Sequence, residues 1–367
     1  MKCPNCGRDV NDNWTVCSYC GFNLKITQNL ADVGRNNAPI KPVKASKKKV
    51  AAVVVSIIVV LILILAMMQS LGTSQSNTVP HEKAWGIYSL DLASSAVALI
   101  YSTDNFIEGL SLNKAGDLLA FAERIGGSGL ENEEICKVRT SGSGFTQMTD
   151  NDKIDTYPAW SSDGSAMYFL SMHGTDLDIC KMMADSGGQM ILYDSGYNDA
   201  DVNAVGSKIV FTRQSQIWSM NADGTGATKV TSPPRAGEWG DANLPFGDYD
   251  PRLSPDGTEI VFERLVGDTS ANGNYDIYSI KVDGTGEKAL TATGYSQGLP
   301  SWSHDGDKIV YTVSAINGVG KYRIYMMDSD GGNNRDVTPS YFPADFLCHT
   351  ATFSNDDSKI YFVGQWY

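Results

Sequence analysis

Four cysteines near the N-terminus have the residue type and spacing of a metal site. Cys3 and Cys6 form one CxxCG turn, and Cys17 and Cys20 form a second one after ten intervening residues. Each turn presents two thiolates to one ion, and four thiolates satisfy the tetrahedral coordination of Zn²⁺. Because protein ligands would fill all four positions, the predicted ion is structural and has no open position for catalysis.

Residues 1–24, which contain these cysteines, resemble the short zinc-ribbon modules at the N-termini of many prokaryotic membrane proteins. Two disulfides or two redox-active CxxC pairs are the alternatives. A reducing cytosolic position disfavours disulfides, and neither pair lies in a βαβ pattern typical of redox motifs. A segment this short cannot bury a useful core, so zinc is expected to supply most of its folding energy.

Residues 50–68 form an uninterrupted apolar stretch in which Ser56 is the one weakly polar side chain. As a helix they would span about 28 Å, close to the ~30 Å hydrocarbon thickness of a bilayer, and no polar stripe interrupts them. A cleaved signal peptide is the alternative, but its apolar region is usually shorter and would not follow about fifty residues. The stretch therefore predicts a single transmembrane helix.

Lysines flank this stretch on one side only, at positions 41, 44, 47, 48 and 49. Since positive charge is retained on the cytoplasmic side, residues 25–49 are interpreted as a basic cytoplasmic linker. Residues 69–82 are then a polar linker to an extracytoplasmic domain. We predict a single-pass protein of the cell membrane, with its N-terminus in the cytoplasm.

The remaining part of the chain, residues 83–367, repeats one pattern six times. An apolar residue precedes a turn that is usually rich in Asp and Gly, and a β-run then closes on an aromatic residue nine positions after the start. The six copies start 42 to 51 residues apart, at Leu112, Trp160, Val202, Leu253, Trp302 and Phe353. This period fits the four short strands of a propeller blade.

A second pattern, two strands joined by a Gly-rich hairpin, follows each of the first five copies. The sixth copy has no such partner after it, but a matching pair of strands occurs at residues 85–101. If this N-terminal pair completes the last blade, the ring closes without a free edge. The predicted fold is therefore an all-β, six-bladed β-propeller over residues 83–367.

Runs such as PRLSPDGTEIVFE and PSWSHDGDKIVYT are similar to the repeats of TolB-like propellers over about residues 85–367. The resemblance implies the fold more than a function, because this repeat encodes packing and turns. Related repeats occur in the propellers of prolyl peptidases and of some pectin lyases. A peptidase architecture would need an additional α/β domain, and the six repeats already account for residues 83–367.

The residues that enter the innermost strands could form a ligand site at the channel mouth. They lie one to four positions before the repeat starts and include Glu108, Asp199, Asp201, Asp250, Arg252 and His349. Carboxylates and one imidazole could hold a divalent cation. A water-filled channel in an acidic domain would carry the same residues without any ligand, and we favour this simpler interpretation.

Two connectors on the same face are unusually long, residues 232–249 and 339–349. They carry six aromatic side chains among acidic residues: Trp239, Phe246, Tyr249, Tyr341, Phe342 and Phe346. Aromatic rings mixed with polar groups are typical of recognition surfaces, so these loops could bind a partner. Alternatively, the loops fold over one end of the channel and seal it with the same rings.

The distribution of charge along the chain limits the partners that the propeller could bind. The first 49 residues have a net charge of +6 and the next 19 carry none, which leaves −19 on residues 69–367. Such a domain repels phosphate backbones, so nucleic acid is not an expected partner. We favour a non-catalytic binding or scaffolding propeller for a protein, peptide or envelope glycan. The alternative is a carbohydrate-active lyase or hydrolase with its site at the channel mouth.

Overall fold

The computed structural model describes residues 78–367 except 186, 241–244, 268–272 and 315–321. The chain divides into two compact units, Met1–Ser74 and Gln75–Tyr367. The four predicted zinc ligands (Cys3, Cys6, Cys17 and Cys20), the basic segment 25–49 and the predicted span 50–68 lie outside the described residues. Within the described part of the chain, no helix has the length and apolar character needed to cross a membrane.

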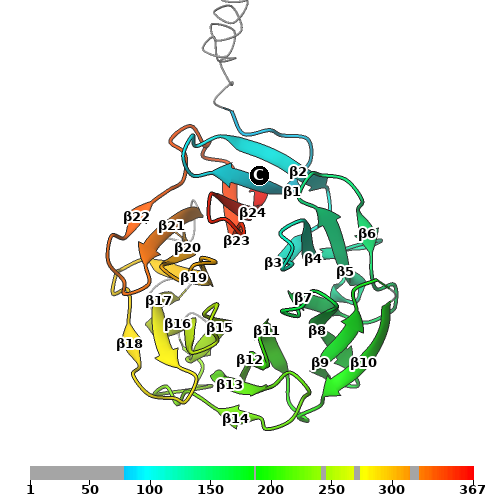
Figure 1. The fold of residues 1–367 in the computed structure, drawn as a ribbon, viewed down its shortest axis with the longest axis vertical. Helices are drawn as coiled ribbons and strands as arrows, with labels where there is room; N and C mark the ends of the chain where they lie inside the picture. The colour runs from blue at the N-terminus through cyan, green and yellow to red at the C-terminus, as the bar shows by residue number, and fades with distance from the viewer. Residues whose placement is uncertain (1–77, 186, 241–244, 268–272, 315–321) are drawn as a thin grey trace, which may run out of the picture. The chain divides into compact units, whose positions relative to one another are not determined.

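The described residues form six four-stranded antiparallel sheets around a central channel, as Figure 1 shows. We number these blades 1 to 6, starting from the sheet that contains β3. From the innermost strand outward, blade 1 is β3 (Ile107–Leu112), β4 (Leu118–Arg124), β5 (Glu133–Arg139) and β6 (Thr146–Gln147), and blade 2 is β7 (Asp155–Trp160), β8 (Ala166–His173), β9 (Asp176–Met183) and β10 (Gly187–Tyr193). In the same order, blade 3 is β11 (Asp199–Val205), β12 (Lys208–Arg213), β13 (Gln216–Asn221) and β14 (Thr228–Lys229), and blade 4 is β15 (Asp248–Leu253), β16 (Glu259–Gly267), β17 (Asn274–Lys281) and β18 (Lys288–Ala289). Blade 5 is β19 (Ser296–Trp302), β20 (Lys308–Ser314), β21 (Arg323–Asp328) and β22 (Arg335–Asp336). A short 3-10 helix, η2 (Leu130–Asn132), lies between β4 and β5. The predicted six-bladed propeller is confirmed.

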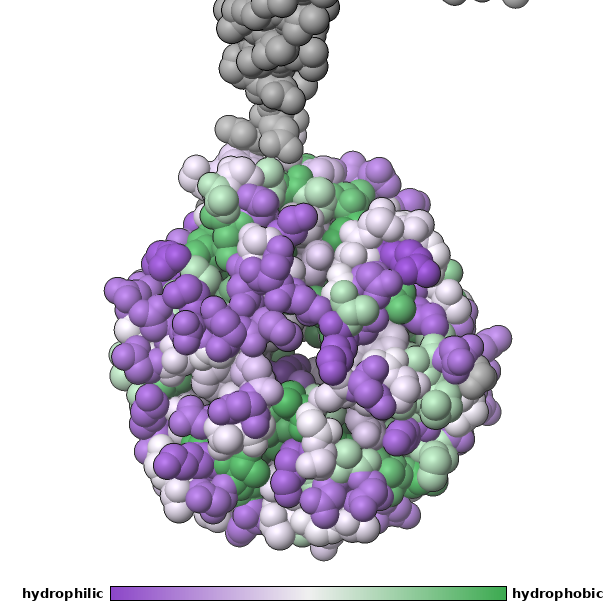
Figure 2. Space-filling view, in the orientation of Figure 1, coloured by the Kyte–Doolittle hydropathy of each residue, from purple (hydrophilic) through white to green (hydrophobic). Residues whose placement is uncertain are grey.

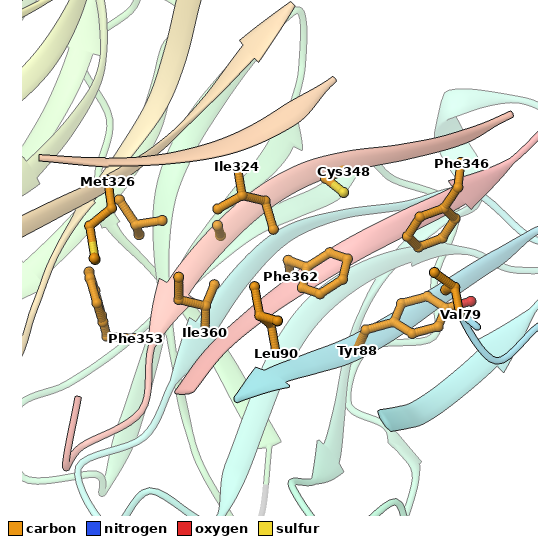
Figure 3. Close-up of a cluster of buried hydrophobic side chains, with 12 residues drawn as sticks. Val79, Tyr88, Leu90, Ile324, Met326, Phe346, Cys348, Phe353, Ile360 and Phe362 are labelled. Atoms are coloured by element: carbon orange, nitrogen blue, oxygen red, sulfur yellow. The ribbon is translucent and has the colours of Figure 1, made fainter. Parts of the chain in front are cut away.

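Blade 6 joins the two ends of the domain. Its strands, from the channel outward, are β23 (Phe346–Phe353), β24 (Lys359–Trp366), β1 (Trp85–Asp91) and β2 (Val97–Thr103). Strands β1 and β24 pair antiparallel along their lengths, with Tyr88 opposite Phe362. Figure 3 shows the side chains of β1, β23 and β24 packing together and against Ile324 and Met326 of blade 5. The predicted closure of the ring by N-terminal strands is confirmed.

The aromatic residue that ends each repeat lies in the core. Five of these positions are Phe121, Phe169, Phe211, Phe262 and Phe362, all fully buried, and the sixth is Tyr311, at 1% exposed. Trp160 packs against Ala120 and Ile135 of the preceding blade, and Trp302 packs likewise against Val261 and Ile277. Blade-to-blade packing of this kind explains why the pattern recurs in every repeat.

The turn between the first two strands of a blade follows from a local hydrogen-bond pattern. In blade 2, Ser161 Oγ donates to Asp163 Oδ1 at 2.7 Å and accepts from the Ala166 amide at 2.9 Å. Asp163 also accepts from the Ser165 amide, and these bonds lower its carboxyl pKa to about 2. Gly164 occupies the left-handed region with φ 74°. Serine, aspartate and glycine at these positions therefore specify the turn.

Part of the predicted polar linker packs onto the propeller. Val79 is 6% exposed within the blade 6 core (Figure 3), and the His81 ring stacks on Trp366 with centroids 4.0 Å apart. Residues 79 and 81, which belong to the predicted linker 69–82, therefore already contact the propeller.

Candidate functional site

Each innermost strand of blades 1 to 5 carries a β-bulge. The pairing with the second strand shifts register at the same place in all five blades. The residue inside the bulge has a positive φ in every case, at Gly109, Tyr157, Asp201, Asp250 and Leu299. A bulge re-aims the groups next to it, and at Asp250 and Leu299 the backbone amide donates to a carboxylate of the neighbouring blade.

Four carboxylates, Glu108, Asp201, Asp250 and Glu263, lie at the level of these bulges, and we call them the acid layer. Three of them accept a hydrogen bond from the next blade. Thr156 Oγ1 donates to Glu108 Oε1 at 2.6 Å, and the Asp250 amide donates to Asp201 Oδ2 at 3.2 Å. The Leu299 amide donates to Glu263 Oε2 at 2.8 Å. The acid layer therefore ties neighbouring blades together at the channel wall.

Burial is the main cause of the unusual electrostatics of the acid layer. It raises the pKa of Glu108 and of Glu263 to about 7 and the pKa of Asp250 well above its ordinary value. The pKa of Asp201 is also raised, first by burial. Arg252 opposes these shifts in Asp201, Asp250 and Glu263, and its Nη2 atom lies 3.8 Å from Asp250 Oδ1. Burial thus disfavours the charged form of these carboxyls, and the nearby Arg252 guanidinium favours it.

One of the six predicted channel-mouth residues, Asp199, lies away from the bulges, and a second, His349, lies at the bulge of blade 6 but outside the acid layer. Asp199 is fully buried in blade 3 and accepts from Arg213 Nε at 2.7 Å. His349 lies between the rings of Trp85 and Tyr322, and burial lowers its pKa. The remaining four, Glu108, Asp201, Asp250 and Arg252, lie at the acid layer.

Sequence reasoning missed Glu263, which lies on the second strand of blade 4. The sequence pattern that could have revealed it is an acidic residue directly after Phe262, inside a strand whose neighbouring positions are mostly buried. The predicted repeat start of blade 3 was also two residues too early, because the first hairpin of this blade is short. Ala204, not Val202, pairs with Ile209, as the repeat starts of the other blades pair with their second strands. This displacement placed Asp199 among the channel residues.

One G-x-S-x-G string, residues 294–298, also occurs in the chain. In a serine hydrolase this motif forms a strained turn from a strand to a helix. Here Ser296 is the first residue of β19 and pairs with Ser314 of β20. The string therefore belongs to a loop that enters a propeller strand, and it does not build a nucleophile elbow.

A cavity of about 650 Å³ occupies the channel between the bulges and the turns at the far ends of the innermost strands. Its lining mixes hydroxyl and amide side chains with apolar ones, and Arg252 lies at the level of the bulges. Figure 2 shows a central hollow bordered largely by hydrophilic residues. The charged lining residues are three cations and one carboxylate: Lys114, Lys208, Arg252 and Asp256. An excess of cations in so acidic a domain favours a ligand with negative charge.

Five of the six aromatic side chains predicted for partner binding take part in packing. Phe346 and Phe342 lie against Phe362 in blade 6, and Tyr341 donates its hydroxyl hydrogen to Ser95 O at 2.6 Å. Phe246 is buried beneath the Arg235 guanidinium, 3.7 Å from its ring centre. Tyr249 bonds to Pro245 O and to Ser215, each at 2.8 Å. Trp239 is 67% exposed, so it is the one ring of the six that is open to a partner.

Comparison with known proteins agrees with the predicted zinc ribbon and with the predicted propeller. Residues 2–24 match the family model of the zinc-ribbon domain. The large unit superposes on the TolB candidate of Agrobacterium tumefaciens with a TM-score of 0.58 and 17% identity, covering 77% of this chain and 98% of that one. The fold of the large unit is TolB-like. TolB from Acinetobacter baumannii gives a TM-score of 0.52 at 16% identity, over 68% of this chain and 62% of that one.

Two curated relatives share part of the sequence. An uncharacterised protein of Agrobacterium fabrum is 29% identical over 183 residues, which is 47% of this chain and 59% of the relative. The Tol-Pal system protein TolB of Desulfosudis oleivorans is 25% identical over 112 residues, 29% of this chain and 26% of the relative. The chain thus spans less than two thirds of either relative. These partial similarities support the fold and identify no ligand.

Proposed function

We propose that this chain is a membrane-tethered binding module whose propeller holds an acidic segment of a protein or peptide in the channel cavity. The observation that carries the proposal is the position of Arg252, which lines the cavity at the level of the bulges with its Nη2 atom 3.8 Å from Asp250 Oδ1. A guanidinium binds a carboxylate with two parallel hydrogen bonds. Lys114 and Lys208 add positive charge nearer the turns.

The lining favours a peptide over a glycan. Sugar rings usually stack on open aromatic faces, but Trp160 and Trp302, the two lining tryptophans, are only 5% and 9% exposed. Hydroxyl and amide side chains from five of the six blades, all but blade 4, can instead bond to a peptide backbone. Binding is also favoured over catalysis, because three carboxylates of the acid layer are engaged by donors of the next blade.

A peptide array tests this proposal with the detergent-solubilised full chain. Decapeptides rich in Asp and Glu should retain the protein better than neutral or basic ones. Arg252→Met should weaken that retention about tenfold or more, since a hydrogen bond to a charged group is worth roughly 1.5–3 kcal/mol. Arg335→Met, at an exposed position of β22, is the matched control and should bind normally. Equal retention of acidic and basic peptides, or an unaffected Arg252→Met, would refute the proposal.

We base the membrane tether on the apolar residues 50–68, and its orientation on the lysines that precede them. Thiol labelling can test its orientation, because Cys136, Cys180 and Cys348 are buried free thiols whose pKa values burial raises. We expect an impermeant maleimide to label Ala289→Cys, on exposed β18, in right-side-out vesicles. Ser46→Cys should react only after lysis. The reverse result would place the propeller on the cytoplasmic side.

A further inference from the structure

The third strand of three blades carries an acidic residue just before a buried isoleucine. In blades 1 and 4 this acid is satisfied by a threonine that lies fourteen residues after the isoleucine. Thr149 Oγ1 donates to Glu134 Oε2 at 2.6 Å, and Thr291 Oγ1 donates to Asp276 Oδ1 at 3.1 Å. A loop amide, from Asn151 or Thr293, completes each arrangement. The acid thus holds the loop that leads to the next blade.

Blade 2 keeps the acid but lacks the threonine. The corresponding acid is Asp178, and the residue fourteen positions after Ile179 is Tyr193, which pairs with Ile179 across the sheet. Asp178 is 2% exposed, and its Oδ1 atom has no hydrogen-bond partner among the described residues. A buried carboxylate oxygen without a partner is costly.

Two further acids lie close to Asp178. Ligand oxygens of Asp176, Asp178 and Asp194 all lie within 4.8 Å of one another, and no other set of three acid, His or Cys ligands does so within the described part of the chain. His173 Nδ1 is 3.7 Å from Asp178 Oδ2 and 3.2 Å from Ser171 O. Burial, with added repulsion from Asp194 and Asp176, raises the pKa of Asp178 to about 6. Three converging carboxylates, one of them buried with an unpartnered oxygen, favour a cation among them.

We propose that blade 2 binds a calcium ion through Asp176, Asp178 and Asp194, and that this ion replaces the threonine and loop amide of blades 1 and 4. Carboxylate oxygens suit calcium, a hard and geometrically tolerant ion that can complete its coordination with water. Bound there, the ion links β9 to the loop that enters β11. It is independent of the cavity ligand proposed above.

Calorimetric titration of the detergent-solubilised full chain with CaCl₂ tests the inference. We expect about one equivalent to bind with a Kd of roughly 10⁻⁴–10⁻³ M, the range of extracellular calcium modules. Asp176→Asn and Asp194→Asn should each weaken binding about tenfold or more. Asn can keep the acceptor that Asp194 Oδ1 offers to the Gly196 amide, so the loop should stay folded.

Asp345→Asn removes one negative charge from an exposed position in a different loop and serves as the matched control. It should bind calcium like the unaltered chain. Thermal unfolding gives a second measurement, because an ion that binds only the folded state raises Tm. The inference is wrong if no heat is measured up to about 10 mM calcium, well above that range. It is also wrong if the Asp176 and Asp194 variants bind as tightly as the control.

Discussion

A chain that begins at Ser102 is expected to be insoluble or to lose most of the stability of the propeller, because it lacks β1 and nearly all of β2. These strands supply the outer half of blade 6, and β1 pairs with β24 along its length. Without them, β24 becomes an exposed edge with unpaired N–H and C=O groups, which invites aggregation.

The loss extends beyond backbone pairing. Ile87, Tyr88 and Leu90 are at most 1% exposed, and burying a side chain of this size contributes about 1.5–3 kcal/mol. Tyr88 stacks on Phe362 with ring centroids 5.5 Å apart, so the truncation also uncovers the core of the strands that remain. The summed loss is comparable to the whole stability of a typical domain.

The matched control begins at Gln75, the first residue of the compact unit, and keeps the contacts of Val79 and His81. It should elute as a soluble monomer and unfold cooperatively in urea. A chain that begins at Glu82 loses those two contacts and should have a lower urea midpoint than the control. If the Ser102 chain unfolds at the same urea concentration as the control, β1 and β2 do not close the ring.

The fold could be predicted because its determinants are local and repeated. In blades 2, 4 and 5 a serine, an aspartate and a glycine build the first turn with hydrogen bonds to their own neighbours, as Ser161, Asp163 and Gly164 show. The aromatic residue that closes each repeat is buried in every blade. The aromatic signal recurs six times and the turn signal three times, so an error in one repeat does not change the blade count.

The sites depend on contacts between blades, which sequence spacing does not report. Glu263 and Leu299 are bonded although they belong to different blades, and a two-residue difference in one hairpin displaced Asp199 from the channel. The six aromatic residues of the long loops could equally serve a partner or the core. Packing decides the matter, since Phe346 is 2% exposed and Trp239 is 67% exposed.

The zinc ribbon poses a different physical problem, because 23 matched residues cannot bury enough apolar area to fold alone. Metal binding must supply the missing free energy, and apparent values of about 10–16 kcal/mol are typical of structural zinc in small domains. The donor set fits this role, since two CxxCG turns offer four thiolates and no open coordination position. We therefore propose that Cys3, Cys6, Cys17 and Cys20 hold one structural Zn²⁺.

A peptide of residues 1–30 is expected to be unfolded without metal and to become ordered with about one equivalent of Zn²⁺. Cys6→Ser should weaken binding by more than the 10–100-fold that altering an outer-shell group costs, because it removes a ligand itself. Ser18→Ala, between the cysteines of the second turn, is the control and should bind normally. Circular dichroism during a zinc titration measures both order and stoichiometry. A peptide that is equally ordered with and without zinc would show that the metal does not drive its folding.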